Sequence, residues 1–350
     1  MRLGRRVVLI GTAALAAPVA LGQSRPDLRN LAREAAIYLT PLAAMYARRF
    51  HDTVERTHKL NRLVREPAPH DGLLQAAAWL DLSSEPLFLA LPAMGGRFYS
   101  AALLDPFTDN FAHVSSRLSG DRPPPHMIAG PTWSGTAPGD VTLIRAPANT
   151  AWLRLHIAVG DDLEAARTLQ AACLLETPDQ RNERRIIEMR ELMRYRSSPP
   201  PEPLADWPAP RPGEPFDLFD TGLAMLGGCT LSEADKALLE ELAPLHLRPG
   251  RRFDARAFSD AERAAIIAGI ADAALEIRQQ GPRLGRTAGD WRYPAPNLGS
   301  FGTDYLYRAW IATTALGATV PAEMLELSRI SDGGTVRFLA PAPELLAALQ

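Results

Sequence analysis

The chain has 350 residues, enough for one large or two modest domains with a sizeable core. Hydrophobic residues make up 46% of it and charged residues 22%, which is the composition of an ordinary globular protein. The formal net charge of -2 gives no overall attraction to nucleic acid or to anionic membranes, so we predict no nucleic-acid partner.

The first 22 residues have the pattern of an export signal. Three arginines precede an apolar run from Val7 to Ala20, and small residues surround Leu21. This order of a basic, an apolar and a small-residue region is typical of a secretory signal peptide. Arg5 and Arg6 also approximate a twin-arginine signal, so the sequence leaves both export routes open. We expect a periplasmic protein with a signal peptide from Met1 to about Gly22, and an uncleaved anchor is the alternative.

We divide the remaining chain into three parts. Residues 23–196 are predicted to form an N-terminal helix and a β-sheet domain. Residues 197–215 are so rich in proline that they indicate an extended linker. Residues 216–350 are predicted to be a helical segment that packs back on the sheet.

The predicted helices lie at both ends of the chain. The first runs from Pro26 to about Glu55, and Pro41 is expected to kink or split it. The later ones are expected over residues 216–227, 232–242, 259–280 and 303–316, and two of them begin with a capping box at Ser232 or Ser259. A final apolar run, Thr335 to Leu339, is predicted to return to the sheet as an edge strand.

Short apolar runs between turn residues indicate a sheet from about Leu73 to Val159. The runs Pro86–Leu91 and Phe98–Leu104 flank a Gly-Gly turn, which predicts a hairpin. Two further strands are expected at Val141–Ile144 and Ala151–Val159. Because strand and helix runs are segregated along the chain, the predicted fold class is α+β. We expect an antiparallel barrel-like β-sheet wrapped by N- and C-terminal helices.

The two cysteines, Cys173 and Cys229, permit one disulfide in an oxidising compartment. Cys173 lies at an apolar position of a helical pattern and Cys229 in a glycine-rich helix end, which favours buried free thiols. The count of cysteines does not decide between these two states.

The sequence has no strong catalytic or cofactor signature. It contains no nucleophile elbow, Walker loop, dinucleotide-binding glycine turn, zinc-type cysteine pair or EF-hand loop. We therefore predict no metal and no cofactor.

Asp105 and Asp109 are the candidate catalytic residues, with Tyr99 beside them. Two carboxylates around a proline turn at a strand end can divide acid and base roles if burial separates their pKa values. The alternative is that both side chains only hydrogen-bond the backbone and set the turn.

The candidate ligand-binding residues lie where the predicted strands end. Two guanidinium forks among them suit a carboxylate or phosphate, so we expect a wall that binds a small polar or anionic ligand. Each arginine has the alternative of a structural ion pair, and the histidine that of a hydrogen-bonded core residue. The members of this wall are Arg97, Asn110, Arg145, Trp152 and His156.

Five segments together resemble the bacterial family known as domain of unknown function 1254. Their order along the chain is specific to that family. The segments are AWLDLS at Ala78–Ser83, the GRFY and LLDPFTDNFA runs at residues 96–112, GPTWSG at residues 130–135, IRAPANTAW at Ile144–Trp152 and NLGSFGTDYLYRA at Asn297–Ala309.

The resemblance implies an exported protein and, in many members, a C-terminal companion, domain of unknown function 1214. We expect this chain to lack that companion. It also departs from the family in keeping only Asp71 of a polar motif before the AWLDLS strand, and in having His156 where an arginine is common.

Two functions follow as expectations. The first is a periplasmic enzyme of the hydrolase or lyase type that acts on a small polar or anionic substrate. The second is a non-catalytic ligand-binding or protein-partner module, motivated by the expected absence of the companion domain. In the second case a homo-oligomer or a partner subunit would cover the sheet.

Overall fold

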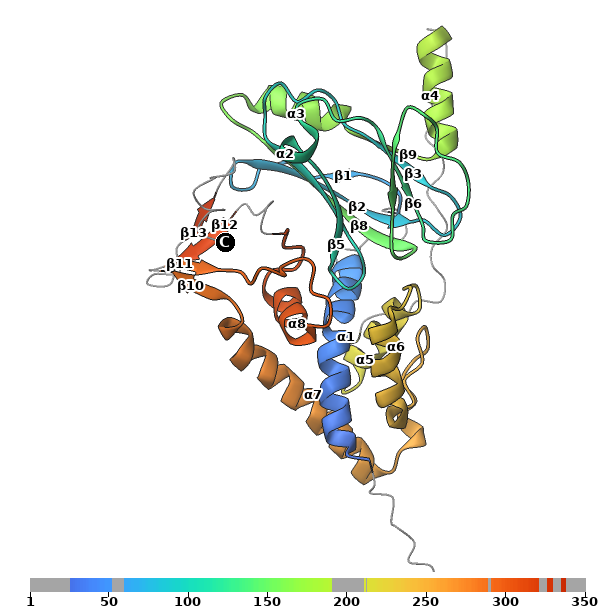
Figure 1. The fold of residues 1–350 in the computed structure, drawn as a ribbon, viewed down its shortest axis with the longest axis vertical. Helices are drawn as coiled ribbons and strands as arrows, with labels where there is room; N and C mark the ends of the chain where they lie inside the picture. The colour runs from blue at the N-terminus through green and yellow to red at the C-terminus, as the bar shows by residue number, and fades with distance from the viewer. Residues whose placement is uncertain are drawn as a thin grey trace, which may run out of the picture.

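A computed structural model of the chain describes residues 26–51, 60–190, 211, 213–288, 291–320, 326–329 and 335–337. The predicted signal peptide and most of the predicted linker lie outside these residues. A five-stranded sheet and a four-stranded sheet lie above a group of helices (Figure 1). This mixed architecture confirms the α+β class. No helix among the described residues has both the length and the apolar character needed to cross a membrane.

The larger sheet, sheet A, is antiparallel throughout and has the strand order β1-β2-β8-β4-β5. Its two longest strands pair along their whole length, so that Trp79 lies opposite Trp152. Neighbouring side chains on one strand point to opposite faces of the sheet, and both faces are covered. Its strands are β1 (Val64–Arg65), β2 (Leu73–Asp81), β4 (Tyr99–Leu104), β5 (Asn110–Ser115) and β8 (Thr150–Ala158).

Sheet B packs against one face of sheet A. Its order is β7-β6-β3-β9, and its β6 and β7 strands are parallel. Apolar side chains of both sheets, such as Leu87 and Leu153, share one buried core. The strands are β3 (Leu87–Ala90), β6 (His126–Ala129), β7 (Thr142–Arg145) and β9 (Leu174–Glu176).

The hairpin predicted across Gly95 and Gly96 is wrong. β3 pairs with β6 and β9 in sheet B, whereas β4 pairs with β5 and β8 in sheet A. All six residues of β4 are buried, as are three of the four in β3. Strands that are apolar on both faces need cover on both, and placing them in two stacked sheets provides it. The two glycines, with φ of 62° and 78°, instead carry the chain from one sheet to the other.

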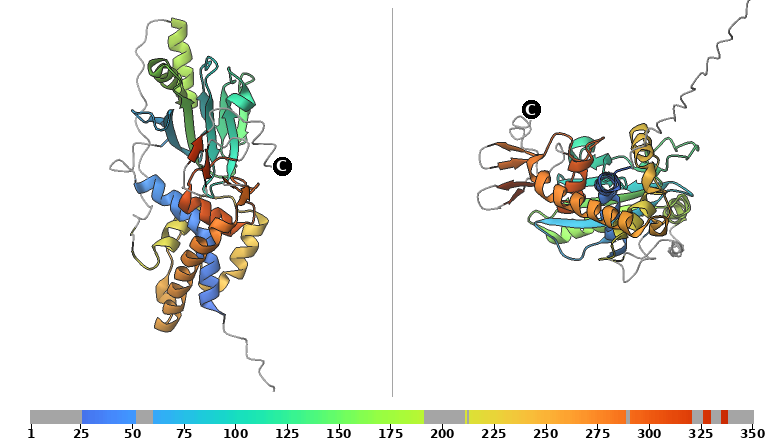
Figure 2. Two further views of the ribbon diagram at one scale, coloured as in Figure 1. Left: turned by 90° about the vertical axis from the view of Figure 1, so that its left-hand side faces the viewer. Right: turned by 90° about the horizontal axis from the view of Figure 1, so that it is seen from below.

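The central helix of the lower layer is α1 (Leu28–His51), which packs against three others. It continues through Pro41, so the predicted split is not formed. Both predicted capping boxes are confirmed, at Ser232 and at Ser259. The view from the side in Figure 2 shows the layer that these helices form below the sheets. The other helices of the layer are α5 (Asp217–Leu226), α6 (Glu233–Glu241), α7 (Asp260–Gln280) and α8 (Tyr305–Thr314).

Shorter elements connect these layers. Three helices accompany the sheets, namely α2 (Ser116–Ser119), α3 (Leu163–Ala172) and α4 (Pro178–Arg190). Single 3₁₀ turns lie at Ala243–Leu245, Ala255–Ala257 and Gly281–Arg283. A third sheet consists of β10 (Arg286–Ala288), β11 (Trp291–Tyr293), β12 (Glu326–Arg329) and β13 (Thr335–Arg337).

Two further expectations about strands are corrected. The run that begins at Thr335 does form a strand, but β13 pairs with β12 in the third sheet and not with sheet A. Sheet A itself is open, because its edge strands β1 and β5 do not pair with each other in the part of the chain described. A barrel-like closure is therefore not confirmed.

Both cysteines are free thiols. Cys173 is buried in the core between the two sheets, where burial raises the pKa of its thiol to about 12. Cys229 lies just beyond α5 and belongs to the helical core instead. The two residues therefore lie in different cores, which agrees with the preference for free thiols.

Candidate functional site

The face of sheet A that is turned toward the helices changes character along its strands. At one end Trp79, Leu104 and Trp152 belong to the core that the helices share. At the other end Phe98 contributes to a small apolar cluster with Leu73 and Ala158. Between the two, the strand register places polar side chains on the same face, which we call the polar band. Its members are Gln75, Ser100, His113, Ser115, Arg154 and His156.

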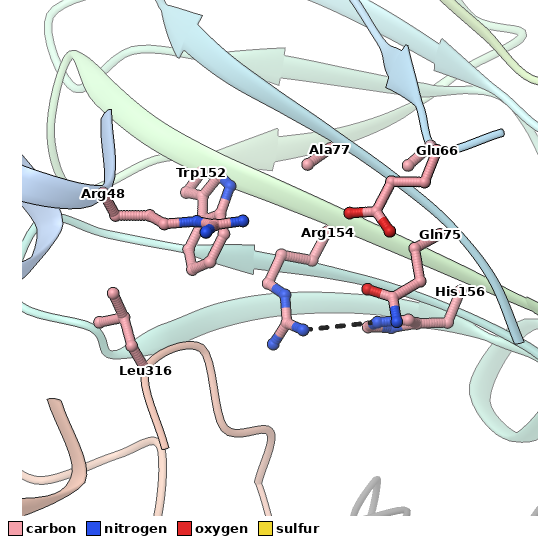
Figure 3. A pocket seen from close by; sticks show the side chains of 9 residues that line it. Arg48, Glu66, Gln75, Ala77, Trp152, Arg154, His156 and Leu316 are labelled. Atoms are coloured by element: carbon pink, nitrogen blue, oxygen red, sulfur yellow. Dashed lines mark hydrogen bonds between the residues drawn. The ribbon is translucent and has the colours of Figure 1, made fainter. Parts of the chain in front are cut away.

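A cavity of about 340 Å³ opens on the part of the polar band formed by β2 and β8 (Figure 3). Room for it exists because Arg154 has alanines opposite it on both neighbouring strands, Ala77 and Ala102. Helix α1 contributes Arg48 to the wall, and the turn after α8 contributes Leu316. The remaining lining residues are Glu66, Gln75, Ala76, Trp152, Arg154 and His156.

Arg154 is half-buried and is held in place from two sides. Its Nη1 atom donates to the carbonyl oxygen of Gly317, and its guanidinium carbon lies 5.2 Å from the ring centre of Trp152. Among the described residues, no carboxylate forms an ion pair with it. Burial, and then the positive charge of Arg48, lowers the pKa of Arg154 to about 10. A guanidinium in this state gains from an anion that compensates its lost hydration.

His156 is 6% exposed and borders the same cavity. Its Nε2 atom lies 3.5 Å from Nη2 of Arg154, and since the guanidinium only donates, this contact makes Nε2 an acceptor. The hydrogen of the neutral ring then lies on Nδ1, which has no partner in the described structure. Burial, followed by the charge of Arg154, lowers the pKa of His156 to about 3. The imidazole is therefore neutral at physiological pH.

Other buried polar atoms of the band also lack hydrogen-bond partners within the described residues. They are Oγ of Ser100, which lies opposite His156, and Nε2 of His113, which lies opposite Ala102. Burial lowers the pKa of His113 to about 4, so this ring is neutral as well. Unsatisfied buried polar atoms are rare in proteins, and several on one sheet face mark the band as a special region.

Trp152 forms the apolar floor of the cavity. Its ring stacks on that of Trp79, with 5.5 Å between the ring centres and an interplanar angle of 9°. Arg48 lies 5.9 Å from the centre of the same Trp152 ring. A rigid aromatic pair of this kind fixes the position of the floor, and two guanidinium groups lie next to it.

Of the residues predicted to bind a ligand, Trp152 and His156 do line one cavity. Arg48, Glu66, Gln75 and Arg154 also line it, and we did not select them from the sequence. The signal that could have identified Arg154 is its position between Trp152 and His156. Residues i, i+2 and i+4 of a strand share a face.

The structure does not bring Arg97 and Arg145 together. Arg97 donates to the carbonyl oxygens of Val159 and Asp162, beyond the C-terminal end of β8. Arg145 lies on β7, before the N-terminal end of β8, and donates to the carbonyl oxygen of Trp133 at 2.7 Å. Each arginine thus binds backbone oxygens of a different loop, and a common anion-binding wall is not formed. The two arginines lie apart because Arg97 precedes β4 of sheet A, whereas Arg145 ends β7 of sheet B.

Tyr99 is also occupied elsewhere. Its ring is fully buried in the core between sheets A and B, on the face opposite to the polar band. Its hydroxyl donates to the carbonyl oxygen of Gly120 at 2.8 Å.

Asp109 and Asn110 hold the segment around α8 against sheet A, and Asp105 supports the turn that carries them. Asp109 accepts hydrogen bonds from the backbone of Phe301 at 2.7 Å and from Nη2 of Arg308 at 2.8 Å. Asn110 donates its side-chain amide to the carbonyl oxygen of Ala318 at 3.0 Å. None of the three lines the cavity above Trp152.

Asp105 directly follows β4 and is 9% exposed. Its Oδ1 atom accepts from the backbone of Asp109 at 2.9 Å. Burial and the neighbouring charge of Asp109 raise the pKa of Asp105 to about 7, against the opposing effect of Arg308. Burial likewise raises the pKa of Asp109. Both carboxyl groups thus have raised pKa values, and they lie in a contact between elements and not at the cavity.

No broad apolar patch lies on sheet A among the described residues. The large hydrophobic side chains that are exposed are Leu118 on α2, Leu143 on β7, and Ile267 and Leu275 on α7. A partner subunit that covers the sheet stays a prediction.

The fold and the cavity define an α+β protein with a cavity on an antiparallel sheet that is lined by the guanidinium groups of Arg48 and Arg154. Residues 52–177 match the family described as "Protein of unknown function (DUF1254)", which confirms the resemblance over this segment. Four of the five motifs lie inside the matched residues, and the segment that begins at Asn297 lies beyond them.

The crystal structure of the VPA0106 protein from Vibrio parahaemolyticus has a similar fold, with a TM-score of 0.66 and 20% sequence identity. The similarity covers 85% of this chain and 70% of that one. An uncharacterised protein from Burkholderia cenocepacia gives a TM-score of 0.23 at 10% identity over 42% of each chain, which is too low for an argument. No curated protein matches the chain.

Proposed function

We propose that this protein binds a small organic anion in the cavity above Trp152. The observation that carries the proposal is Arg154, a half-buried guanidinium that opens on the cavity and has no carboxylate partner among the described residues. Guanidinium groups bind carboxylates through paired hydrogen bonds, and they do so most strongly where water is partly excluded.

The surroundings of Arg154 fit a small carboxylate better than a large one. The volume of about 340 Å³ is at the lower end for ligand pockets. Arg48 adds a second positive charge at the wall, and Trp152, Ala77 and Leu316 offer apolar contacts to a short carbon chain.

Binding accounts for the cavity better than catalysis does. An imidazole with a pKa of about 3 is a very weak base near neutral pH, so His156 is a poor general base. The carboxyl group with the most suitable pKa, that of Asp105, does not line the cavity. A hydrolase or lyase activity at Asp105 is the second candidate function, and only its pKa near 7 favours it.

The proposal includes a periplasmic location. It is supported by the order of basic, apolar and small residues at positions 1–22. An exported binding protein for small carboxylates agrees with both lines of argument.

The test is isothermal titration calorimetry with short carboxylates on the protein and on an Arg154→Gln variant. Arg248→Gln is the matched control, because Arg248 is exposed and lies in the helical layer. We expect the Arg154 variant to bind at least about 20-fold more weakly, or ~2 kcal/mol, and the control to bind like the unchanged protein. Equal affinities for the two variants would refute the proposal.

A further inference from the structure

The cavity has a negative side as well as a positive one. Glu66 follows β1 directly, and its backbone N–H donates to the carbonyl oxygen of Gln75 at 2.9 Å. Because Gln75 pairs with His156 in the sheet, Glu66, Gln75 and His156 form one row across three chain segments. Arg154 lies in the next row, two residues from His156. Positive and negative groups are therefore separated along the cavity wall.

Glu66 is an exposed residue at the edge of the cavity, and its side chain lines the cavity wall. In Figure 3 its carboxylate lies on the same side as the amide of Gln75, and the guanidinium of Arg48 lies at the opposite end. Among the described residues, Glu66 forms no ion pair with Arg154, although its charge acts to raise the pKa of that arginine. The carboxylate and the guanidinium thus share a cavity while remaining too far apart to satisfy each other directly.

The two groups differ in the hydrogen bonds that they can form. Arg154 can only donate hydrogen bonds, so its complement is an anion. The carboxylate of Glu66 accepts, so its complement is an ammonium or another strong donor. The amide of Gln75, which can both donate and accept, lies beside His156 in the same wall. A single molecule that carries a carboxylate at one end and an ammonium a few bonds away would satisfy both groups at once.

From this arrangement we infer that the ligand is a zwitterion of the amino-acid class, with its carboxylate on Arg154 and its ammonium on Glu66. The inference rests on the proposed function, since it assigns the second half of the same ligand. His156 supports it because a neutral imidazole adds no positive charge beside Gln75 and Glu66, where the ammonium would approach.

The experiment compares matched acids with and without an amino group by titration calorimetry. The pairs are propionate with alanine, and butyrate with 4-aminobutyrate, so the distance between the charges also varies. Each is titrated into the unchanged protein, Arg154→Gln, Glu66→Gln and the control Glu240→Gln, whose side chain is exposed on α6. Thermal unfolding of each variant verifies that it folds.

We expect at least one amino acid to bind about tenfold or more tightly than its partner without the amino group. In Glu66→Gln this ratio should fall below about threefold, while the affinity for the plain carboxylate stays the same or increases. Glu240→Gln should keep the full ratio.

Two other outcomes distinguish a failure of the zwitterion inference from a failure of the proposed anion binding. If the plain carboxylates bind in a manner that depends on Arg154, and the amino group gives no advantage, the zwitterion is wrong and the anion site stands. If no acid of either kind shows binding that depends on Arg154, both are wrong.

Discussion

Nη2 of Arg154 lies 3.5 Å from Nε2 of His156, on the same face of β8 and two residues apart. Two basic side chains this close cannot both be charged at low cost. The guanidinium keeps its charge, and the imidazole takes the neutral form, with a pKa lowered to about 3. This contact combines a cation that is ready for an anion with a neutral hydrogen-bonding neighbour.

The first prediction concerns stability in acid. The pKa of His156 is about 3 in the folded protein and 6.5 when unperturbed, so the unfolded chain binds the proton more readily. Its contribution to stability is present above pH 6.5 and is lost as the pH falls toward 3. Between pH 7 and pH 4 the loss is on the order of 3 kcal/mol. His156→Gln should lack this part of the loss in urea unfolding at the two pH values, and parallel profiles would refute the assignment.

The buried carboxyl group of Asp105 predicts that the free energy of unfolding depends on pH with the opposite sign. Its pKa is raised from 3.8 to about 7, so the folded protein holds the proton more tightly than the unfolded chain. The contribution is present below pH 3.8 and is lost as the pH rises through 7. The free energy of unfolding of Asp105→Asn, relative to that of the unchanged protein, should therefore rise by about 2 kcal/mol or more between pH 4 and pH 8. A constant difference in unfolding free energy across that range would contradict the prediction.

The ion pair between Asp109 and Arg308 is predicted to hold α8 on sheet A. The Arg308 side chain is only 5% exposed, so removing it leaves a largely buried carboxylate without its partner. Arg308→Met should lower the free energy of unfolding by about 3–5 kcal/mol. The control is Arg263→Met, because Arg263 pairs with Asp260, whose side chain is 97% exposed. This control substitution should lower the free energy of unfolding by less than about 1 kcal/mol. Similar costs for the two variants would refute the structural role.

Export is predicted from the first 22 residues. Expression in a Gram-negative host should deliver a periplasmic protein whose N-terminus, read by mass spectrometry, begins near Gln23. Replacing Arg5 and Arg6 with lysine should block export only if the twin-arginine route is used. Recovery of the chain from the cytoplasm with Met1 or Arg2 at its start would contradict the prediction.

The sequence predicted the segregation of strands from helices well. Capping boxes and apolar periodicity are local signals, and the helices that begin near Ser232 and Ser259 follow them closely. Strand pairing was predicted less well, because β3 and β4 are apolar on both faces and their pattern does not indicate which sheet each joins. The Gly-Gly turn between them fits a change of sheet as well as a hairpin.

The candidate site was predicted in part for a related reason. Trp152 was selected at a strand end and His156 as a histidine inside the same predicted strand, and their alternation on that strand places both in one cavity. Arg97 and Arg145 were selected because each ends a strand, a criterion that carries no information about which ends meet. Arg48 comes from helix α1, and Glu66 directly follows the two-residue strand β1. Only the folded chain brings them to the cavity that Arg154 lines.

The most direct test of the anion site is a crystal structure of the protein with the carboxylate that binds most tightly in calorimetry. We expect the carboxylate to lie within hydrogen-bond distance of the Arg154 guanidinium, with Trp152 beneath it and Arg48 at its side. A carboxylate bound elsewhere on the molecule, with only water beside Arg154, would contradict the account.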